Sequence, residues 1–278
     1  MERERAAQLG FWPAAPSGGL ADKGVMEKAS RMADDRAFEG KVVLVTGATR
    51  GLGLAMAHGF AARGADIIVV GRKPDATQAA ARAIEATGRR AWPIAAHMGQ
   101  WDAAGRLADE ALDKAGRVDI LINNAGITPL APSSSAVTEE LFDKIMAVNF
   151  KGPFRLSALL GSHMQASGGG AIINVSSLGS IRTEPHYAVY GAAKQAINVL
   201  TRAHAVEYGP TVRVNALLPG PFWTDMTAAW REEGDKNCPN AIRRMGRPEE
   251  IVSTALYLAS PASSFTTGAL ILVDGYVR

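Results

Sequence analysis

The chain has 278 residues, of which 47% are hydrophobic and 21% are charged, and its formal net charge is +3. This length suits one large folded domain, and the small charge excludes nucleic acid or an anionic membrane as the main partner. The single cysteine, Cys238, excludes an internal disulfide and a multi-cysteine metal site, so no metal site is expected. We expect a reducing, cytoplasmic setting, and no apolar run approaches the length that spans a bilayer.

The first 40 residues mix acidic, basic, Ala, Gly and Pro residues without the apolar core of a signal peptide. Glu2, Glu4 and Asp22 argue against a transit peptide, which is poor in acids. We therefore expect residues 1–40 to form a disordered or loosely attached arm, and we place the folded domain at residues 41–278.

From Lys41 onward, short apolar runs rich in β-branched residues alternate with helical stretches. The predicted strands are 41–46, 66–70, 91–95, 118–122, 171–175, 212–216 and 270–273. The predicted helices are 51–63, 75–87, 102–114, 139–148, 152–165, 188–208 and 249–259. The alternation predicts a single α/β domain, with a doubly wound parallel sheet of the Rossmann type and helices on both faces. Pro93 interrupts the third strand and favours a position near the sheet edge.

A glycine-rich turn, TGATRGLG at residues 46–53, joins the first strand to the first helix. Gly47 can make the tight turn because it lacks a Cβ, while Gly51 and Gly53 allow a ligand and the helix to approach the backbone closely. The N-terminus of the helix then presents free N–H groups to a diphosphate. A plain glycine-rich loop is the alternative, but the strand–turn–helix context favours nucleotide binding.

Tyr190 and Lys194 lie four residues apart in a predicted helix and therefore share one face. A nearby ammonium lowers the pKa of a phenol, so this pair can act as a general acid or base on an alcohol or ketone. Ser176 and Ser177 end the preceding strand, where a hydroxyl can hydrogen-bond a substrate oxygen. By itself the Tyr/Lys spacing is typical of a surface helix, and the two serines alone favour hydrogen bonds to loop backbone.

Together these residues resemble the short-chain dehydrogenase/reductase family in its single-domain branch. The resemblance covers nearly all of residues 41–275 and depends on five elements in the right order. They are TGATRGLG (46–53), NNAG (123–126), Asn149 in VNFKGPF, Ser177 with YGAAK (190–194), and PGPFWT (219–224). The NNAG element alone also suits a turn, with amides in contact with a ribose or an adjacent strand.

The resemblance implies a role for each matching residue. Tyr190 would be the catalytic acid/base, Ser177 would polarise the substrate carbonyl, and Lys194 would bind the nicotinamide ribose. Asn149 would help to hold a water that relays protons to Lys194. The implied cofactor-binding positions are Gly47, Thr49, Arg50, Gly51, Leu52, Gly53, Arg72, Met98, Asn124, Ala125, Gly126, Tyr190, Lys194, Pro219, Phe222 and Thr224. One departure concerns the adenine, because His97-Met98 stands where the family usually has an Asp.

The expected function is NAD(P)-dependent interconversion of a secondary alcohol and a ketone by hydride transfer. NADP is favoured over NAD, because the second strand ends in Gly71-Arg72-Lys73 without an acidic residue and Arg50 adds another cation. Some relatives with a similar GR pair accept both cofactors, and the arginines can also be solvated surface charges. A nucleotide-binding regulator without catalysis is the alternative function. A sugar-nucleotide epimerase or dehydratase usually carries a longer C-terminal domain, for which there is no room.

Two further expectations concern assembly and substrate. The helix 188–208 is apolar on more than one face, which predicts a homodimer or homotetramer; the positions are Ala192, Ala196, Val199, Leu200 and Ala203. Two segments, 178–186 and 222–246, should cover the nicotinamide, the second through an apolar wall of Phe222, Trp223, Met226 and Trp230. Its later half, rich in charges at residues 231–236, is expected to be solvated and mobile. Arg182 and His186 can meet an anionic end of a substrate or instead pair with acids such as Glu184.

Overall fold

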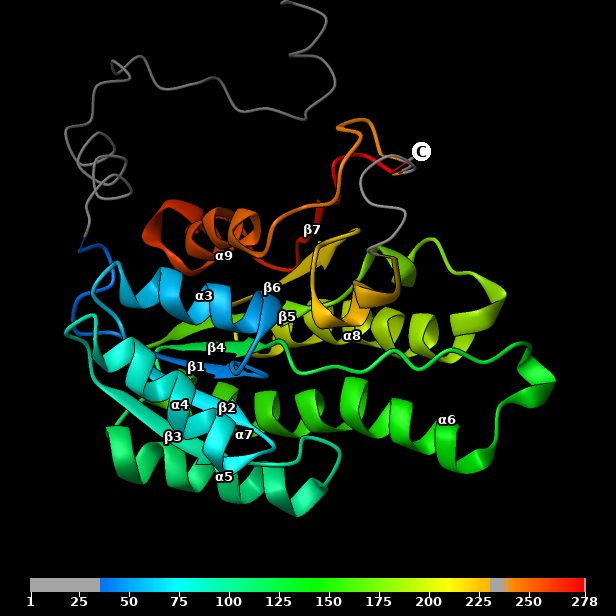
Figure 1. Ribbon diagram of the computed structural model, residues 1–278. Coiled ribbons are helices and arrows are strands. Elements are labelled where there is room, and N and C mark those ends of the chain that lie inside the picture. The colour runs from blue at the N-terminus through cyan, green and yellow to red at the C-terminus, as the bar shows by residue number, and fades with distance from the viewer. Residues whose placement is uncertain (1–35, 231–237, 239, 278) are drawn as a thin grey trace, which may run out of the picture.

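A seven-stranded parallel sheet is the centre of the computed structural model, which describes residues 36–230, 238 and 240–277 (Figure 1). The strands are β1 (Val42–Thr46), β2 (Asp66–Gly71), β3 (Ala91–Ala95), β4 (Ile120–Asn123), β5 (Gly170–Val175), β6 (Val212–Pro219) and β7 (Leu270–Val273). Their order in the sheet is β3-β2-β1-β4-β5-β6-β7, and every neighbouring pair is parallel. The predicted Rossmann-like fold is confirmed, and its order reverses between β1 and β4, where a ligand crevice is expected.

Helices cover both faces of this sheet (Figure 1). They are α3 (Gly51–Ala61), α4 (Pro74–Glu85), α5 (Trp101–Ala115), α6 (Glu139–Met146), α7 (Gly152–Ala166), α8 (Ala188–Glu207) and α9 (Val252–Ala259). Alternate strand residues point to opposite faces, so Val43 and Val45 pack with α3, α4 and α9, while Val42 and Leu44 pack with α5, α7 and α8. In the described part of the chain, no helix combines the length and apolarity that a membrane crossing needs.

The edge position predicted for the third strand is confirmed, since β3 pairs with β2 alone. Pro93 lies opposite Val69 in this pairing. Because proline has no N–H to donate, an edge strand is where the sheet can accept it.

The helices predicted at 139–148 and 152–165 join into one helix, because a π-turn, Ala147–Lys151, connects α6 to α7. Pro153 is the physical reason for the wider turn, since it cannot donate to the carbonyl four residues earlier, which belongs to Asn149. π-turns inside helices often mark functional sites. The predicted functional residue Asn149 lies in the middle of this one.

The segment before β1 contributes to the core. Phe38, assigned above to the N-terminal arm, is buried and packs edge to face on Phe60 with ring centroids 4.9 Å apart. The packed domain therefore includes residues on the N-terminal side of Lys41. The arm prediction for residues 1–35 and the mobility prediction for residues 231–237 lie outside the described residues.

Candidate active site

A cavity of about 970 Å³ opens at the carboxyl ends of the strands. This volume is at the upper end of the roughly 300–1,000 Å³ range of ligand pockets. Segments from both halves of the chain line it, from the turn after β1 to the residues after β7. Most predicted site residues lie on its surface: Gly47, Thr49, Arg50, Gly51, Leu52, Arg72, Met98, Asn124, Ala125, Gly126, Ser177, Tyr190, Lys194, Pro219, Phe222 and Thr224. Gly53 and Asn149 are not among the lining residues.

The glycine turn is held by close packing. Gly47 has a φ of 67°, and a Cβ there would lie 2.9 Å from the Asn124 side-chain nitrogen. A Cβ on Gly53 would collide with the Gly47 carbonyl oxygen and with that same nitrogen. Asn124 donates its amide to the carbonyl oxygens of Thr46 and Gly47, at 2.9 and 3.2 Å. Gly53 and Asn124 thus hold the turn in the shape that brings the backbone of Gly47 to the cavity.

The start of α3 suits a diphosphate. Its first residues, Gly51 and Leu52, line the cavity. No side chain caps this helix, and its first turn has no acidic residue. The first N–H groups of a helix lack partners within the helix and attract anions. The described residues therefore fit the phosphates of a dinucleotide at this end.

The charges around the cavity are mainly positive. Arg50, Arg72 and Lys73 line the end near β2, and Asp225 is the only carboxylate among the described lining residues. Asp225 forms an ion pair with Arg50 at 3.2 Å, in which both side chains are largely exposed. Met98, at the position where the family has an Asp, is buried and offers the cavity an apolar contact.

Ser177 and Tyr190 meet at the other end of the cavity. Gly179 donates its N–H to the Ser177 hydroxyl at 3.0 Å. Burial raises the pKa of the Tyr190 phenol, and a hydrogen bond with Ser177 lowers it by a smaller amount. The Ser176 hydroxyl donates instead to the Lys194 carbonyl at 3.0 Å. Of the two serines, Ser177 is therefore the one whose hydroxyl acts beside the phenol.

Lys194 is buried beneath Tyr190, with 4% of its surface exposed. Its ammonium donates to the Val175 carbonyl at 2.8 Å and lies 5.9 Å from the centre of the Tyr190 ring. Burial lowers the pKa of Lys194 to about 8. The sequence analysis expected this ammonium to lower the pKa of Tyr190, whereas burial raises it in the structure. The reason is that desolvation disfavours the charged form of both groups.

Asn149 lies behind the cavity and is fully buried. Its amide donates to the Ile127 and Ile145 carbonyls at 2.9 Å, and its oxygen accepts from the Ile127 N–H at 3.2 Å. These bonds tie the π-turn to the strand end beside Gly126. The role of Asn149 in a proton relay to Lys194 stays a prediction.

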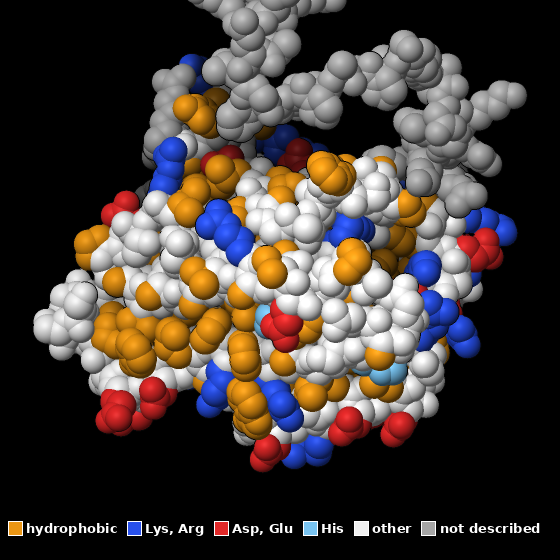
Figure 2. Space-filling model, turned by 180° about the vertical axis from the view of Figure 1, so that it is seen from behind, with side chains coloured by type: hydrophobic (Ala, Val, Ile, Leu, Met, Phe, Trp, Pro, Cys, Tyr) orange, Lys and Arg blue, Asp and Glu red, His pale blue; other side chains and the backbone are white. Residues whose placement is uncertain are grey.

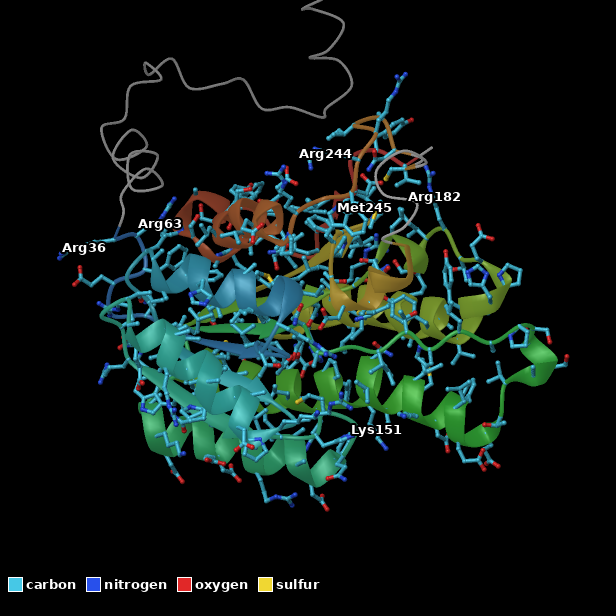
Figure 3. The ribbon with its side chains drawn as sticks, in the orientation of Figure 1. Arg36, Arg63, Lys151, Arg182, Arg244 and Met245 are labelled. Atoms are coloured by element: carbon cyan, nitrogen blue, oxygen red, sulfur yellow. The ribbon has the colours of Figure 1, made fainter. Side chains whose placement is uncertain are left out.

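The structure places only some of the residues expected to contact the substrate on the surface of the cavity. Phe222, Met226 and His186 line the cavity, whereas Trp223 and Arg182 are not among its lining residues. The side chain of Trp230 lies outside the described part. Arg182 is on the exposed bend before α8 (Figure 3), where its carbonyl accepts the Tyr187 hydroxyl at 3.1 Å.

Several lining residues were not singled out from the sequence. Leu130, Lys144 and Val277 belong to this set. Leu130 lies in the long connection after β4, Lys144 lies in α6, and Val277 follows the last strand. No motif indicates such positions, because only the folded chain brings them to the same end of the sheet.

Comparisons with known proteins agree with the geometry. A family model described as short chain dehydrogenase matches residues 41–235. The chain is 40% identical to galactitol 2-dehydrogenase (L-tagatose-forming) of Cereibacter sphaeroides, over 86% of this chain and 95% of that protein. The structure of a gluconate 5-dehydrogenase from Burkholderia cenocepacia, in complex with NADP and tartrate, superposes with a TM-score of 0.82. Its identity is 33%, and the match covers 87% of this chain and 97% of that one.

A second solved structure is a 7α-hydroxysteroid dehydrogenase in complex with NADH and a 7-oxo bile acid, with a TM-score of 0.81. It is 31% identical, and the match covers 88% of this chain and 98% of that one. These similar proteins therefore include one structure with NADP and one with NADH.

Proposed function

Because this chain belongs to the short-chain dehydrogenase/reductase family, we propose that it interconverts a secondary alcohol and a ketone with NADP or NAD. The observation that best supports this proposal is that the glycine turn lines the same cavity as Ser177, Tyr190 and Lys194. Family membership makes the chain an oxidoreductase; the alcohol/ketone chemistry is our proposal.

A bound nicotinamide dinucleotide supplies or accepts the hydride. In the reduction, Tyr190 donates its phenolic proton to the carbonyl oxygen, which becomes the hydroxyl of the alcohol. An ordinary phenol is already protonated at neutral pH, and burial raises the pKa of Tyr190 further, which suits a proton donor. Ser177 lies beside the phenol and can donate a hydrogen bond to the same oxygen. Lys194 stands behind Tyr190, where its ammonium can hold a ribose and replace the lost proton by way of solvent.

The charge distribution supports NADP as the preferred cofactor. Arg50, Arg72 and Lys73 line the end of the cavity near β2, where an acidic residue would repel a ribose phosphate. Arg50 already forms an ion pair with the Asp225 carboxylate. Among the described residues, Arg72 is therefore the arginine that remains available to bind a phosphate. An arginine suits this task because its planar fork offers paired donors.

The experiment is to follow oxidation of the reduced cofactor over a panel of ketones, with NADPH and NADH in parallel. Turnover of a ketone supports the proposal. Tight cofactor binding without turnover of any ketone or alcohol would favour the alternative, a nucleotide-binding regulator without catalysis. A strong preference for NADH would overturn the choice of NADP.

We also propose that the protein works in the cytoplasm as a homodimer or homotetramer. The rear face of the molecule shows groups of hydrophobic side chains among charged ones (Figure 2). On α8, Val199 is 61% exposed and Val206 is 85% exposed, which suits a helix from a second copy. Light scattering at micromolar concentration should give the mass of two or four chains, and Val199→Glu should lower it. A monomeric wild type would contradict this proposal.

A further inference from the structure

The substrate loop, residues 222–246, leaves and rejoins the fold at a hydrogen-bonded neck. Phe222 and Gly246 form a parallel bridge. The Trp223 N–H donates to the Gly246 carbonyl, and the Gly246 N–H donates to the Pro221 carbonyl, each at 2.8 Å. Residues 240–246, called here the return limb of the loop, thus end directly beside the start of the loop.

The same return limb pairs with the segment that follows β7, residues 274–277, called here the post-β7 segment. Asn240 and Val277 form an antiparallel bridge, and the Ala241 N–H lies 3.0 and 2.9 Å from the carbonyls of Gly275 and Tyr276. The limb (orange) and the post-β7 segment (red) run together in Figure 1. Figure 3 labels Arg244 and Met245 on this limb.

Asn240 is the centre of this junction and is 6% exposed. Its amide donates to the Arg244 carbonyl at 2.8 Å and to the Asp274 carbonyl at 3.3 Å, while its oxygen accepts from the Arg244 N–H at 3.3 Å. One side chain therefore satisfies backbone groups of both segments. Leaving such a buried polar group without its partners is unfavourable, which makes the pairing specific.

The post-β7 segment also has its own fixed shape. The Asp274 carboxylate accepts from the Tyr276 and Val277 N–H groups at 2.9 and 3.1 Å. A Cβ on Gly220 would lie 2.5 Å from the Cβ of Asp274, so the segment is packed against the turn after β6. Val277 is carried in this way to the cavity, where Met245 of the return limb is also a lining residue.

We propose that Val277 is a specificity-determining residue, which limits the size of the apolar group beside the reacting carbon, and that Asn240 is the positioning residue that holds it there. This inference rests on the proposed function. It assigns part of the cavity wall to a residue outside every family motif. The group that this wall accepts is apolar, since Val277 and Met245 offer it no hydrogen bond.

The test uses a series of methyl ketones with lengthening alkyl chains, for which kcat/KM is measured in the wild type, Val277→Ala and Val277→Phe. One methylene in a pocket is worth about 10–200-fold in discrimination. Val277→Ala should raise the ratio of kcat/KM for the longest ketone to that for the shortest by roughly 10-fold. Val277→Phe should lower that ratio by a similar factor and change the shortest ketone less than about twofold.

Tyr276→Asn is the matched control, because Tyr276 is the exposed neighbour and asparagine tolerates its φ of 59°. The control should leave the ratio unchanged. An unchanged ratio in both Val277 variants, or the same change in the control, would overturn the role of Val277. A wild type that turns over no ketone at all would instead overturn the proposed function, and with it this inference.

The role of Asn240 is tested by combining variants. If Asn240 positions Val277, the effect of Val277→Phe should largely disappear in an Asn240→Ala background, because the freed segment can yield. The dissociation constant of the cofactor, measured by fluorescence, should stay unchanged and shows that the fold is intact. Equal effects of Val277→Phe in both backgrounds would contradict the positioning role, and Asn240→Ser offers the same comparison if the alanine variant does not fold.

Discussion

The glycine turn and the substrate loop both leave the carboxyl end of a strand in one sheet, yet they are held in different ways. In the turn, a close approach of Gly53 to Gly47 is combined with hydrogen bonds from one side chain of the adjacent strand end, Asn124. In the loop, the neck and Asn240 join segments more than twenty residues apart. The residues that shape the cofactor end therefore fall within recognisable motifs, whereas those that hold the substrate loop fall within none.

The acid/base lies between these two regions and should give the largest effect. Tyr190→Phe removes the transferable proton and keeps the ring, so kcat should fall by roughly 10²–10⁴-fold. Binding of the cofactor should survive, because the glycine turn is untouched. Steady-state kinetics and cofactor titration check the two halves of this prediction.

Tyr187→Phe is the control for this variant. Tyr187 also lines the cavity, but its hydroxyl donates to the Arg182 carbonyl on the exposed bend. We expect its kcat to change by less than a factor of about three, since a neutral hydrogen bond at an exposed site contributes little. Near-normal turnover in Tyr190→Phe would refute the assignment of the acid/base.

The cofactor end alone should respond to Arg72→Ala. Loss of a charge-assisted bond to a ribose phosphate costs about 1.5–3 kcal/mol, so kcat/KM for NADPH should fall by roughly 10–100-fold. The value for NADH should stay nearly constant. Arg82→Ala removes an exposed cation of α4 that is not among the cavity-lining residues and should change neither value.

Asp225→Asn should act in the opposite direction to Arg72→Ala. The carboxylate now holds Arg50 at 3.2 Å, and its loss leaves this arginine available to the cofactor phosphate. Because the pair is largely exposed, we expect a gain for NADPH of less than about 10-fold. Equal effects of the Arg72 substitution on NADPH and NADH would remove Arg72 from the phosphate site.

Lys194→Met should lower turnover and yet stabilise the cofactor-free protein. Burial lowers the pKa of Lys194 from 10.5 to about 8, and each pKa unit corresponds to about 1.4 kcal/mol. After subtraction of about 1 kcal/mol for the bond to the Val175 carbonyl, the variant should gain about 2 kcal/mol at pH 7.

The lowered pKa of Lys194 also predicts how the stability difference between the variant and the wild type changes with pH. Below pH 8 both the folded and the unfolded wild type carry the ammonium, so the folded state bears the whole cost of burying it. Between pH 8 and 10.5 the unfolded chain binds more protons, and wild-type stability rises with pH relative to the variant. Urea unfolding at pH 7 and pH 10 should therefore show the advantage of Lys194→Met shrinking. An advantage that grows with pH would contradict the explanation.

The smallest effect is expected at the exposed bend before α8. Arg182 is not among the cavity-lining residues, whereas His186 is. With a matched pair of ketones, one neutral and one carboxylated, Arg182→Ala should change kcat/KM for each by less than about twofold, as for other surface substitutions. His186→Ala is the comparison variant. A selective loss on the carboxylated ketone in Arg182→Ala would restore this arginine to the site.

Much of the fold was predictable because its signals are local. Buried parallel strands are short apolar runs, and the alternation with helices defines the sheet class. Strand and helix ends were less well predicted: the strand predicted at 212–216 extends to Pro219. The π-turn at Ala147–Lys151 also joins two helices that the sequence analysis kept apart, since the pattern does not show how Pro153 is accommodated.

The sequence by itself determined the family, the sheet class and the residues at the turn after β1 and around Tyr190, because each carries a recognisable local pattern. Tertiary structure alone decided that burial raises the pKa of Tyr190 and lowers that of Lys194, since desolvation depends on everything packed around a group. It also decided that Asp225 holds Arg50 and that Val277 reaches the cavity. Arg50 and Asp225, like Val277 and the other cavity-lining residues, come from segments far apart in the sequence, over which a sequence pattern carries no geometric information.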